Sequence, residues 1–156
     1  MNQTPARCLI LACGNTLRGD DGVGLWLAEW AGQRFSTQAD VRVIADHQWT
    51  PELAEDVARA ESVLFIDCCV SSLPGSVTLA PVEPLSSGSE HNTHHLGAAE
   101  LLALGQELYH SLPRNALSLT IGAGSTEFGE VFSDPVNAAL PQACNSIERT
   151  IHAWMQ

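Results

Sequence analysis

The sequence predicts a three-layer α/β/α domain around a mostly parallel, twisted sheet of about five strands. Short apolar runs bounded by turn residues alternate along the chain with helical patterns. The run at residues 63–66 is continuously apolar, which is typical of a parallel strand buried on both faces. The chain shows no internal repeat and no linker. Its 156 residues therefore predict a single domain over residues 1–156.

The first half of the chain contains three of the expected strands. Glycines and turn residues follow the first apolar run and lead into the first helix, whose Leu25, Leu27 and Ala28 we expect to face the sheet. Thr50 and Pro51 are typical of the cap and first position of the second helix. The elements expected here are strands at about 8–13, 41–45 and 63–66 and helices at about 22–33 and 50–60.

The second half begins with a segment rich in Ser, Pro and Gly at residues 71–89, where we expect only a short edge strand. An amphipathic pattern then predicts a helix, and Asp134 with Pro135 predicts the start of a terminal helix. The elements expected here are strands at about 77–79 and 116–121 and helices at about 96–108 and 134–154.

Composition excludes several classes of protein. Hydrophobic residues make up 45% of the chain and charged residues 16%, which argues against disorder. Seven Arg and no Lys oppose 18 acidic residues, and the net charge of -11 argues against nucleic acid and anionic membranes as partners. The first apolar run is too short for a membrane span or a signal peptide, so we expect a cytoplasmic protein. The five Cys show no C-x-x-C spacing and are expected to be reduced thiols.

The loop after the first strand carries two adjacent carboxylates, Asp20 and Asp21, among glycines. In open α/β sheets, functional groups lie just beyond the carboxyl ends of strands. The glycine spacing at 14–19 is not G-x-G-x-x-G, and a P-loop lysine is absent, so a nucleotide-binding loop is excluded. Two carboxylates would repel a diphosphate and attract a metal cation. The alternative is that one of them only caps the following helix. Arg18 is a candidate to orient Asp20 or to contact a substrate.

Two further polar residues are expected at the same edge of the sheet. Asp67 ends the third strand, and His94 precedes a helix whose N-terminus should face this edge. Together with Asp21 they form an oxygen and nitrogen set suited to Ni, Zn, Mn or Fe. The alternatives are that Asp67 accepts hydrogen bonds from loop N–H groups and that His94, like His95, is a solvated loop histidine.

These residues carry a resemblance. The pattern G-N-x-L-x-x-D-D-G-x-G at residues 14–24, the apolar strand ending in Asp67, and T-H-x-L at residues 93–96 resemble, in order and spacing, the motifs of the hydrogenase maturation endopeptidases. The resemblance implies a cytoplasmic protease, of the aspartyl endopeptidase type, that removes the C-terminal peptide of a [NiFe]-hydrogenase large-subunit precursor after nickel insertion. It implies that Asp21, Asp67 and His94 are the catalytic, metal-contacting residues, and that the substrate supplies the nickel, with none permanently bound.

One segment departs from the commonest pattern of that family. After the second strand many members have Asp-Gly-Gly-Thr, whereas this chain has Asp46, His47, Gln48 and Trp49 ahead of Thr50. This variant resembles members that serve NAD-linked bidirectional hydrogenases. We expect these four residues to contribute to substrate recognition, with Trp49 a candidate contact residue.

The sequence also restricts the chemistry. It has neither the G-x-S-x-G of a nucleophile elbow nor the H-E-x-x-H of a helical zinc protease, and nothing pairs Cys13 or Cys69 with a base. Metal-assisted peptide hydrolysis is therefore the favoured reaction. Two alternatives remain open: a nickel-sensing maturation chaperone that binds the precursor without cutting it, and a small-molecule metallohydrolase that carries its own Zn or Mn.

Overall fold

The computed structural model describes residues 5–86 and 96–156. Five strands form one sheet in the order β2-β1-β3-β5-β4. The strands are β1 (Cys8–Cys13), β2 (Val41–Asp46), β3 (Ser62–Cys69), β4 (Val77–Pro81) and β5 (Asn115–Gly122). All neighbouring pairs are parallel except β4, which runs antiparallel to β5 at the edge. The predicted mostly parallel five-stranded sheet is confirmed.

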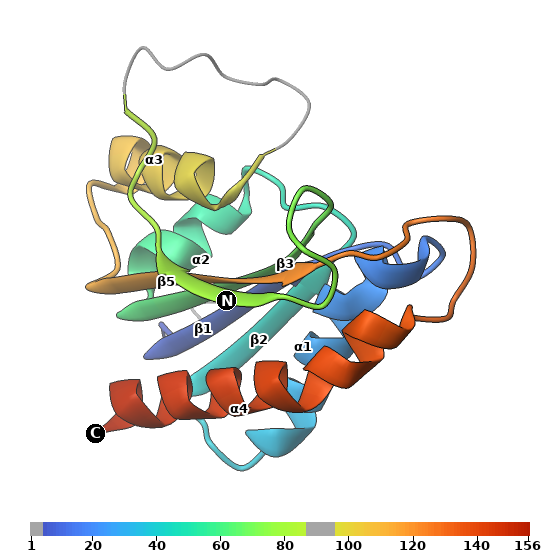
Figure 1. Cartoon of the computed structure of the whole chain (residues 1–156). Coiled ribbons are helices and arrows are strands. Elements are labelled where there is room, and N and C mark those ends of the chain that lie inside the picture. The colour runs from blue at the N-terminus through green and yellow to red at the C-terminus, as the bar shows by residue number, and fades with distance from the viewer. Residues whose placement is uncertain (1–4, 87–95) are drawn as a thin grey trace.

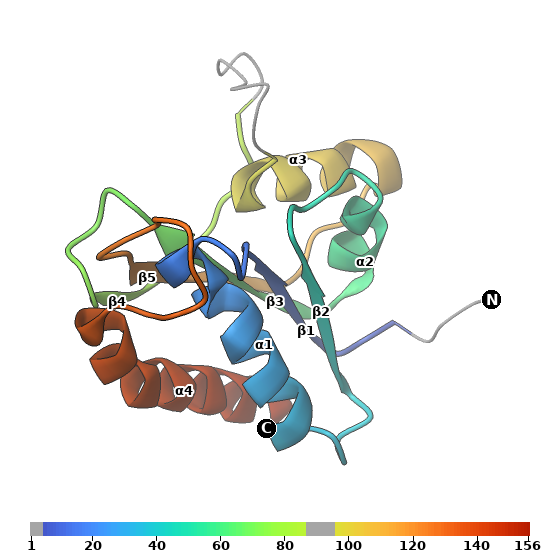
Figure 2. The same ribbon diagram turned by 90° about the vertical axis from the view of Figure 1, so that its right-hand side faces the viewer.

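Helices cover both faces of this sheet. They are α1 (Val23–Arg34), α2 (Leu53–Arg59), α3 (Ala98–Tyr109) and α4 (Asp134–Met155), and a 3-10 turn η1 (Gly19–Gly22) precedes α1. Helices α1 and α4 lie on one face and α2 and α3 on the other (Figures 1 and 2). The predicted three-layer α/β/α architecture is therefore confirmed. Within the described ranges, no helix combines the length and apolar character needed to cross a membrane.

Strand β1 is apolar at every position because its side chains point alternately to the two faces of the sheet and both faces are covered. Successive side chains of a strand point to opposite faces. Cys8, Ile10 and Ala12 belong to the core cluster that includes residues of α1 and α4. Leu9 and Leu11 belong to the cluster that includes residues of α2 and α3. Both faces of the strand are thus buried, as the apolar runs predict.

Several details differ from expectation. Helix α2 begins at Leu53 with Glu52 as its N-cap residue, so the expectation that Thr50 and Pro51 form the cap and first position of this helix is wrong. Strand β3 does not end at Asp67, because β5 continues to pair with it, joining Asp67 to Thr120 and Cys69 to Gly122. Asp67 is thus held inside a paired strand rather than in a loop. In the first helix, Leu25 is only half-buried, whereas Leu27 and Ala28 are buried. Because the 3-10 turn comes first, α1 starts at Val23, and its buried face includes Val23 as well.

Two glycines of the first motif allow the chain to pass close to itself. A Cβ on Gly14 would lie 2.1 Å from the carbonyl oxygen of Asp21, and one on Gly24 would lie 2.4 Å from that of Cys13. Both neighbours are backbone atoms and cannot rotate away. These contacts hold the loop between β1 and α1 against the end of the strand.

A pair of substitutions in α1 tests this packing. Gly24→Ala should lower the free energy of unfolding by about 2–3 kcal/mol, because the new methyl group overlaps the backbone of β1. Gly32→Ala is the matched control: nothing lies within 4 Å of its Cβ position, so it should raise stability by about 0.5–1 kcal/mol through helix propensity. Urea denaturation measures both, and equal effects would contradict the close contact at Gly24.

Candidate functional site

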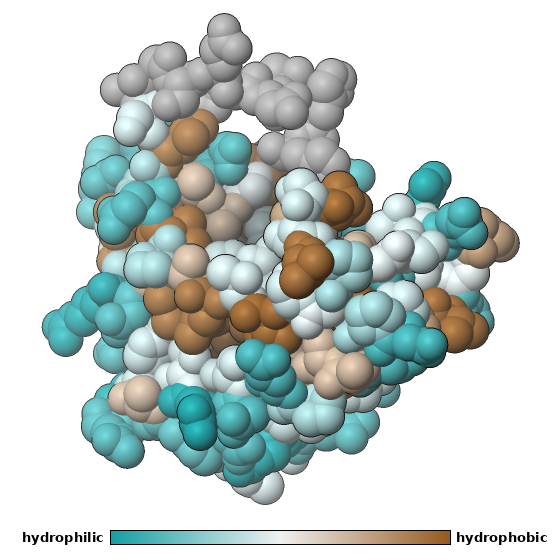
Figure 3. All heavy atoms as spheres, in the orientation of Figure 1, coloured by the Kyte–Doolittle hydropathy of each residue, from teal (hydrophilic) through white to brown (hydrophobic). Residues whose placement is uncertain are grey.

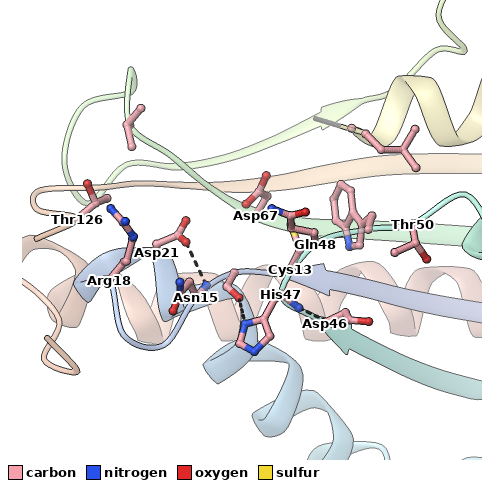
Figure 4. A pocket seen from close by; sticks show the side chains of 15 residues that line it. Cys13, Asn15, Arg18, Asp21, Asp46, His47, Gln48, Thr50, Asp67 and Thr126 are labelled. Atoms are coloured by element: carbon pink, nitrogen blue, oxygen red, sulfur yellow. Dashed lines mark hydrogen bonds between the residues drawn. The ribbon is translucent and has the colours of Figure 1, made fainter. Parts of the chain in front are cut away.

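A pocket of about 710 Å³ lies at the carboxyl edge of the parallel strands. It is lined by six of the residues singled out from the sequence: Asp21, Asp46, His47, Gln48, Trp49 and Asp67. Figure 4 shows the carboxylates of Asp21 and Asp67 on the same side of this pocket. His94 lies outside the described residues, while Leu96 and Gly97, shortly after it in the chain, line the same pocket.

The two neighbouring carboxylates of the first motif have different environments. Asp20 is fully buried. Its Oδ2 accepts hydrogen bonds from the backbone N–H of Gly124 (2.7 Å) and Ser125 (2.9 Å) and from the Ser133 hydroxyl (2.6 Å), and its Oδ1 accepts one from the Ser133 N–H (2.7 Å). Burial alone would raise the pKa of Asp20, but the bonds from Ser133, Ser125 and Gly124 together hold this pKa below its usual range.

Asp21 instead lines the pocket. Its Oδ2 accepts a hydrogen bond from the backbone N–H of Asn15 at 3.0 Å. Neither Asp20 nor Asp21 caps a helix, because Gly22 is the N-cap residue of α1 and that end has no side-chain cap. The capping alternative is therefore wrong. Asp20 is oriented by the loop after β5, while Arg18 lines the pocket with Asp21.

Asp67 projects from β3 beside the end of β1. Its Oδ1 accepts a hydrogen bond from the N–H of Cys68 at 2.7 Å, and its carboxylate is hydrogen-bonded to the thiol of Cys13. Burial, followed by the charge and hydrogen bond of Asp67, raises the pKa of the Cys13 thiol far above its usual value. Burial and the charges of Asp21 and Asp67 raise the pKa of Cys68 to about 12. Both thiols are therefore protonated at neutral pH and are poor nucleophiles.

Cys69 has a different environment. Hydrogen bonds from the side chains of Ser71 and Ser72 lower its pKa to about 7. Its sulfur lies 3.2 Å from the Ser71 hydroxyl. Cys69 does not line the pocket with Asp21 and Asp67.

The segment after β2 divides into exposed and buried residues. Asp46, His47 and Gln48 are exposed, and the Nδ1 of His47 lies 3.2 Å from the carbonyl oxygen of Gly14. Trp49 is only 7% exposed and packs against Phe65, with the ring centroids 5.4 Å apart. Trp49 is thus mainly a core residue whose remaining surface meets the pocket. The position of this segment after a strand predicted that it lies at the pocket, but it did not predict that Trp49 is buried.

The pocket also contains residues that were not identified from the sequence. Val70 follows β3, and Thr126 lies in the loop after β5. Both residues lie beyond the carboxyl ends of strands. Because functional groups of open α/β sheets gather there, their position after a strand is the signal by which they could have been found. Neither belongs to a recognisable motif.

The metal-binding capacity of the described residues is incomplete. In the ranges 5–86 and 96–156, no group of three or more His, Cys, Asp and Glu side chains is arranged to hold a metal ion. Asp21 and Asp67 supply carboxylate oxygens, which suit divalent cations. His94, the third ligand predicted from the sequence, lies outside these ranges.

The Asp20 contacts predict a loss of stability on removal of its charge. Asp20→Asn should lower the free energy of unfolding by about 3 kcal/mol at neutral pH, because an amide accepts these bonds less well and turns an N–H group toward other donors. Since the folded state lowers the pKa of Asp20, its contribution is present above the unfolded pKa and is lost as pH falls through the folded value.

Denaturation between pH 2 and 7 measures this effect. The wild type should lose stability below about pH 4, and Asp20→Asn should show a shallower loss there. Asp21→Asn is the matched control, because its amide oxygen can still accept the bond from Asn15. Equal stability of the two variants at pH 7 would contradict the role of Asp20.

Comparisons with known proteins bear on the fold. No family model and no curated protein matches the chain. Several solved structures are similar to it, and three of them illustrate the likeness. The hydrogenase maturating endopeptidase HybD from E. coli is 19% identical, with a TM-score of 0.76 over 94% of this chain and 93% of that one. The [NiFe] hydrogenase maturation protease HycI from Thermococcus kodakarensis is 24% identical, with a TM-score of 0.69 over 97% and 94%.

The third is the [NiFe] hydrogenase maturation protease HybD from Thermococcus kodakarensis, which is 26% identical, with a TM-score of 0.64 over 92% of this chain and 98% of that one. The similarity thus extends over nearly the full length of each protein. Across nearly its whole length, the chain has the fold of the hydrogenase maturation endopeptidases, the family that its motifs resemble.

Proposed function

We propose that this protein is an endopeptidase of hydrogenase maturation that removes the C-terminal peptide of a [NiFe]-hydrogenase large-subunit precursor after nickel insertion. One observation carries the proposal: Asp21 and Asp67 line one open pocket, in a fold shared with maturation proteases along nearly the whole chain. The pocket is large enough to accept several residues of an extended peptide.

Nickel enters this proposal as part of the substrate. The carboxylates of Asp21 and Asp67 would contact the nickel of the loaded precursor, with His94 as the third contact. Asp21 and Asp67 bring two negative charges to this end of the pocket, and these charges contribute to the raised pKa of the Cys13 and Cys68 thiols. A bound cation would be favoured there, and an unloaded precursor would leave the two charges uncompensated.

The residues of the pocket then position the scissile segment. The substrate's nickel supplies positive charge beside the peptide, where it can polarise the carbonyl or a water molecule. Arg18, which lines the same pocket, is placed to bind a peptide carbonyl or the C-terminal carboxylate through its guanidinium. No separate general base is assigned.

A mass measurement tests the function directly. The purified protein is incubated with nickel-loaded precursor, and the precursor should lose the mass of its C-terminal peptide. Binding without a change in mass would favour the maturation chaperone instead. Stoichiometric Zn or Mn in the freshly purified protein would favour the small-molecule metallohydrolase.

The Asp67 carboxylate provides a sharper test. Asp67→Asn should leave the fold intact, because the amide oxygen can still accept the bond from the Cys68 N–H. It should abolish processing, because the amide lacks the charge that a divalent cation requires. Asp40→Asn, an exposed substitution just before β2 and away from the pocket, is the control and should process normally. An Asp67→Asn protein that melts normally and still cuts would remove Asp67 from the site.

The segment after β2 gives a further prediction. Gln48→Ala should weaken processing of the native precursor without loss of stability, because Gln48 is exposed at the pocket. Trp49→Ala should lower the free energy of unfolding by about 3 kcal/mol, because it removes a buried ring packed on Phe65. Thermal melting together with the precursor mass separates the two effects. Unchanged processing by Gln48→Ala would exclude this residue from recognition.

A further inference from the structure

The most exposed large hydrophobic residues of the described chain gather on two loops. Val70 is 74% and Leu73 77% exposed in the β3–β4 loop, and Phe128 is 88% and Val131 82% exposed in the β5–α4 loop. Other exposed large hydrophobic residues, such as Leu108 at 55%, are covered to a greater extent. We call these four residues the apolar rim. Figure 3 shows hydrophobic residues protruding over both loops.

Both loops are held firmly by the backbone around them. In the β3–β4 loop, the N–H of Gly75 donates to Gly122 at 2.9 Å, and a Cβ on Gly122 would lie 1.9 Å from the carbonyl oxygen of Leu73. In the β5–α4 loop, Gly129 exchanges hydrogen bonds with the β1–α1 loop, donating to Leu17 at 2.8 Å and accepting from Gly19 at 2.7 Å.

The rim meets the pocket at Val70. Val70 lines the pocket itself, and Thr126, two residues before Phe128, lines it from the other loop. A protein whose C-terminal peptide enters this pocket would therefore place its folded body against the rim. Because backbone hydrogen bonds already hold Gly75 and Gly129 within these loops, less conformational entropy would be lost on contact.

The charges beside the rim define the partner's surface. Glu127 and Glu130 are exposed next to Phe128 and Val131, and the whole chain carries a net charge of -11. A complementary surface would have an apolar depression that accepts an aromatic side chain, bordered by Lys or Arg. Exposed aromatic residues of this kind commonly dominate the binding energy of protein interfaces.

We propose that the apolar rim is the docking surface for the folded body of the precursor, which binds there through an apolar patch bordered by basic residues while its C-terminal peptide occupies the pocket. This inference rests on the proposed function. It assigns substrate affinity to Phe128, Val131 and Leu73, residues that do not line the pocket with Asp21 and Asp67.

The test compares rim variants with a matched exposed position. The Phe128→Ser/Val131→Ser double variant should melt at the wild-type temperature, since both side chains are exposed. It should raise the KM for nickel-loaded large-subunit precursor by about tenfold or more and leave kcat unchanged. Leu108→Ser, on α3, should leave both constants at wild-type values. Glu127→Gln/Glu130→Gln should slow association and weaken its dependence on salt.

The outcomes separate the two proposals. A double variant that processes the precursor with the wild-type KM, or a Leu108→Ser protein with the same loss as the double variant, would overturn the docking surface while the proposed function stands. A wild-type protein that neither binds nor cuts the nickel-loaded precursor would overturn the proposed function and this inference with it. A selective rise in KM in the rim variant supports both.

Discussion

The buried carboxylate of Asp20 is the interaction on which the site depends. Through four hydrogen bonds, Asp20 joins the β1–α1 loop to Gly124, Ser125 and Ser133, which lie more than 100 positions further along the chain. Because Asp20 itself is fully buried, its carboxylate depends on the donors of Gly124, Ser125 and Ser133 for the hydrogen bonds that burial denies it from water. Because Asp20 is used in this way, its neighbour Asp21 remains available in the pocket. The same anchor fixes the β5–α4 loop, which contributes Thr126 to the pocket and carries Phe128.

The order of strands explains why Asp21 and Asp67 meet. Strand β1 lies between β2 and β3, so the chain leaves β1 toward one side of the sheet and later continues from β3 toward the other. The carboxyl ends of β1 and β3 therefore border a crevice of the kind in which open α/β sheets bind ligands. Asp21 follows β1, and Asp67 lies near the end of β3. Strand β3 pairs with residues Cys8 to Ala12 of β1, so the carboxyl ends of the two strands lie side by side. Topology brings the two carboxylates to one pocket without any local sequence link between them.

The sequence predicts the layers well because burial on both faces leaves a plain signal in β1 and β3, and because glycines mark the loop before α1. The sequence predicts the environment of a residue less well where that environment is formed by segments distant in the chain. Asp67 lies inside a strand because β5 pairs beyond it, which no pattern around residue 67 reveals. The role of Asp20 depends on Ser133, whose contact with it has no local signature. The six described site residues were found because they lie at or just beyond the carboxyl ends of strands, and His94 stays a prediction outside the described ranges.

Two aromatic residues show where sequence reasoning is weakest. Trp49 follows a strand and looked suited to contact a substrate, yet Phe65 and the α2 side of the sheet bury most of it. Phe128 belongs to no periodic pattern and is 88% exposed. Periodicity reports burial only within helices and strands, because the repeat of the element fixes which side chains face the core. In a loop, which has no such repeat, the exposure of a side chain depends on the hydrogen bonds that hold the backbone in place. Here the hydrogen bonds of Asp20 and Gly129 hold the backbone inward and leave the side chain of Phe128 outside.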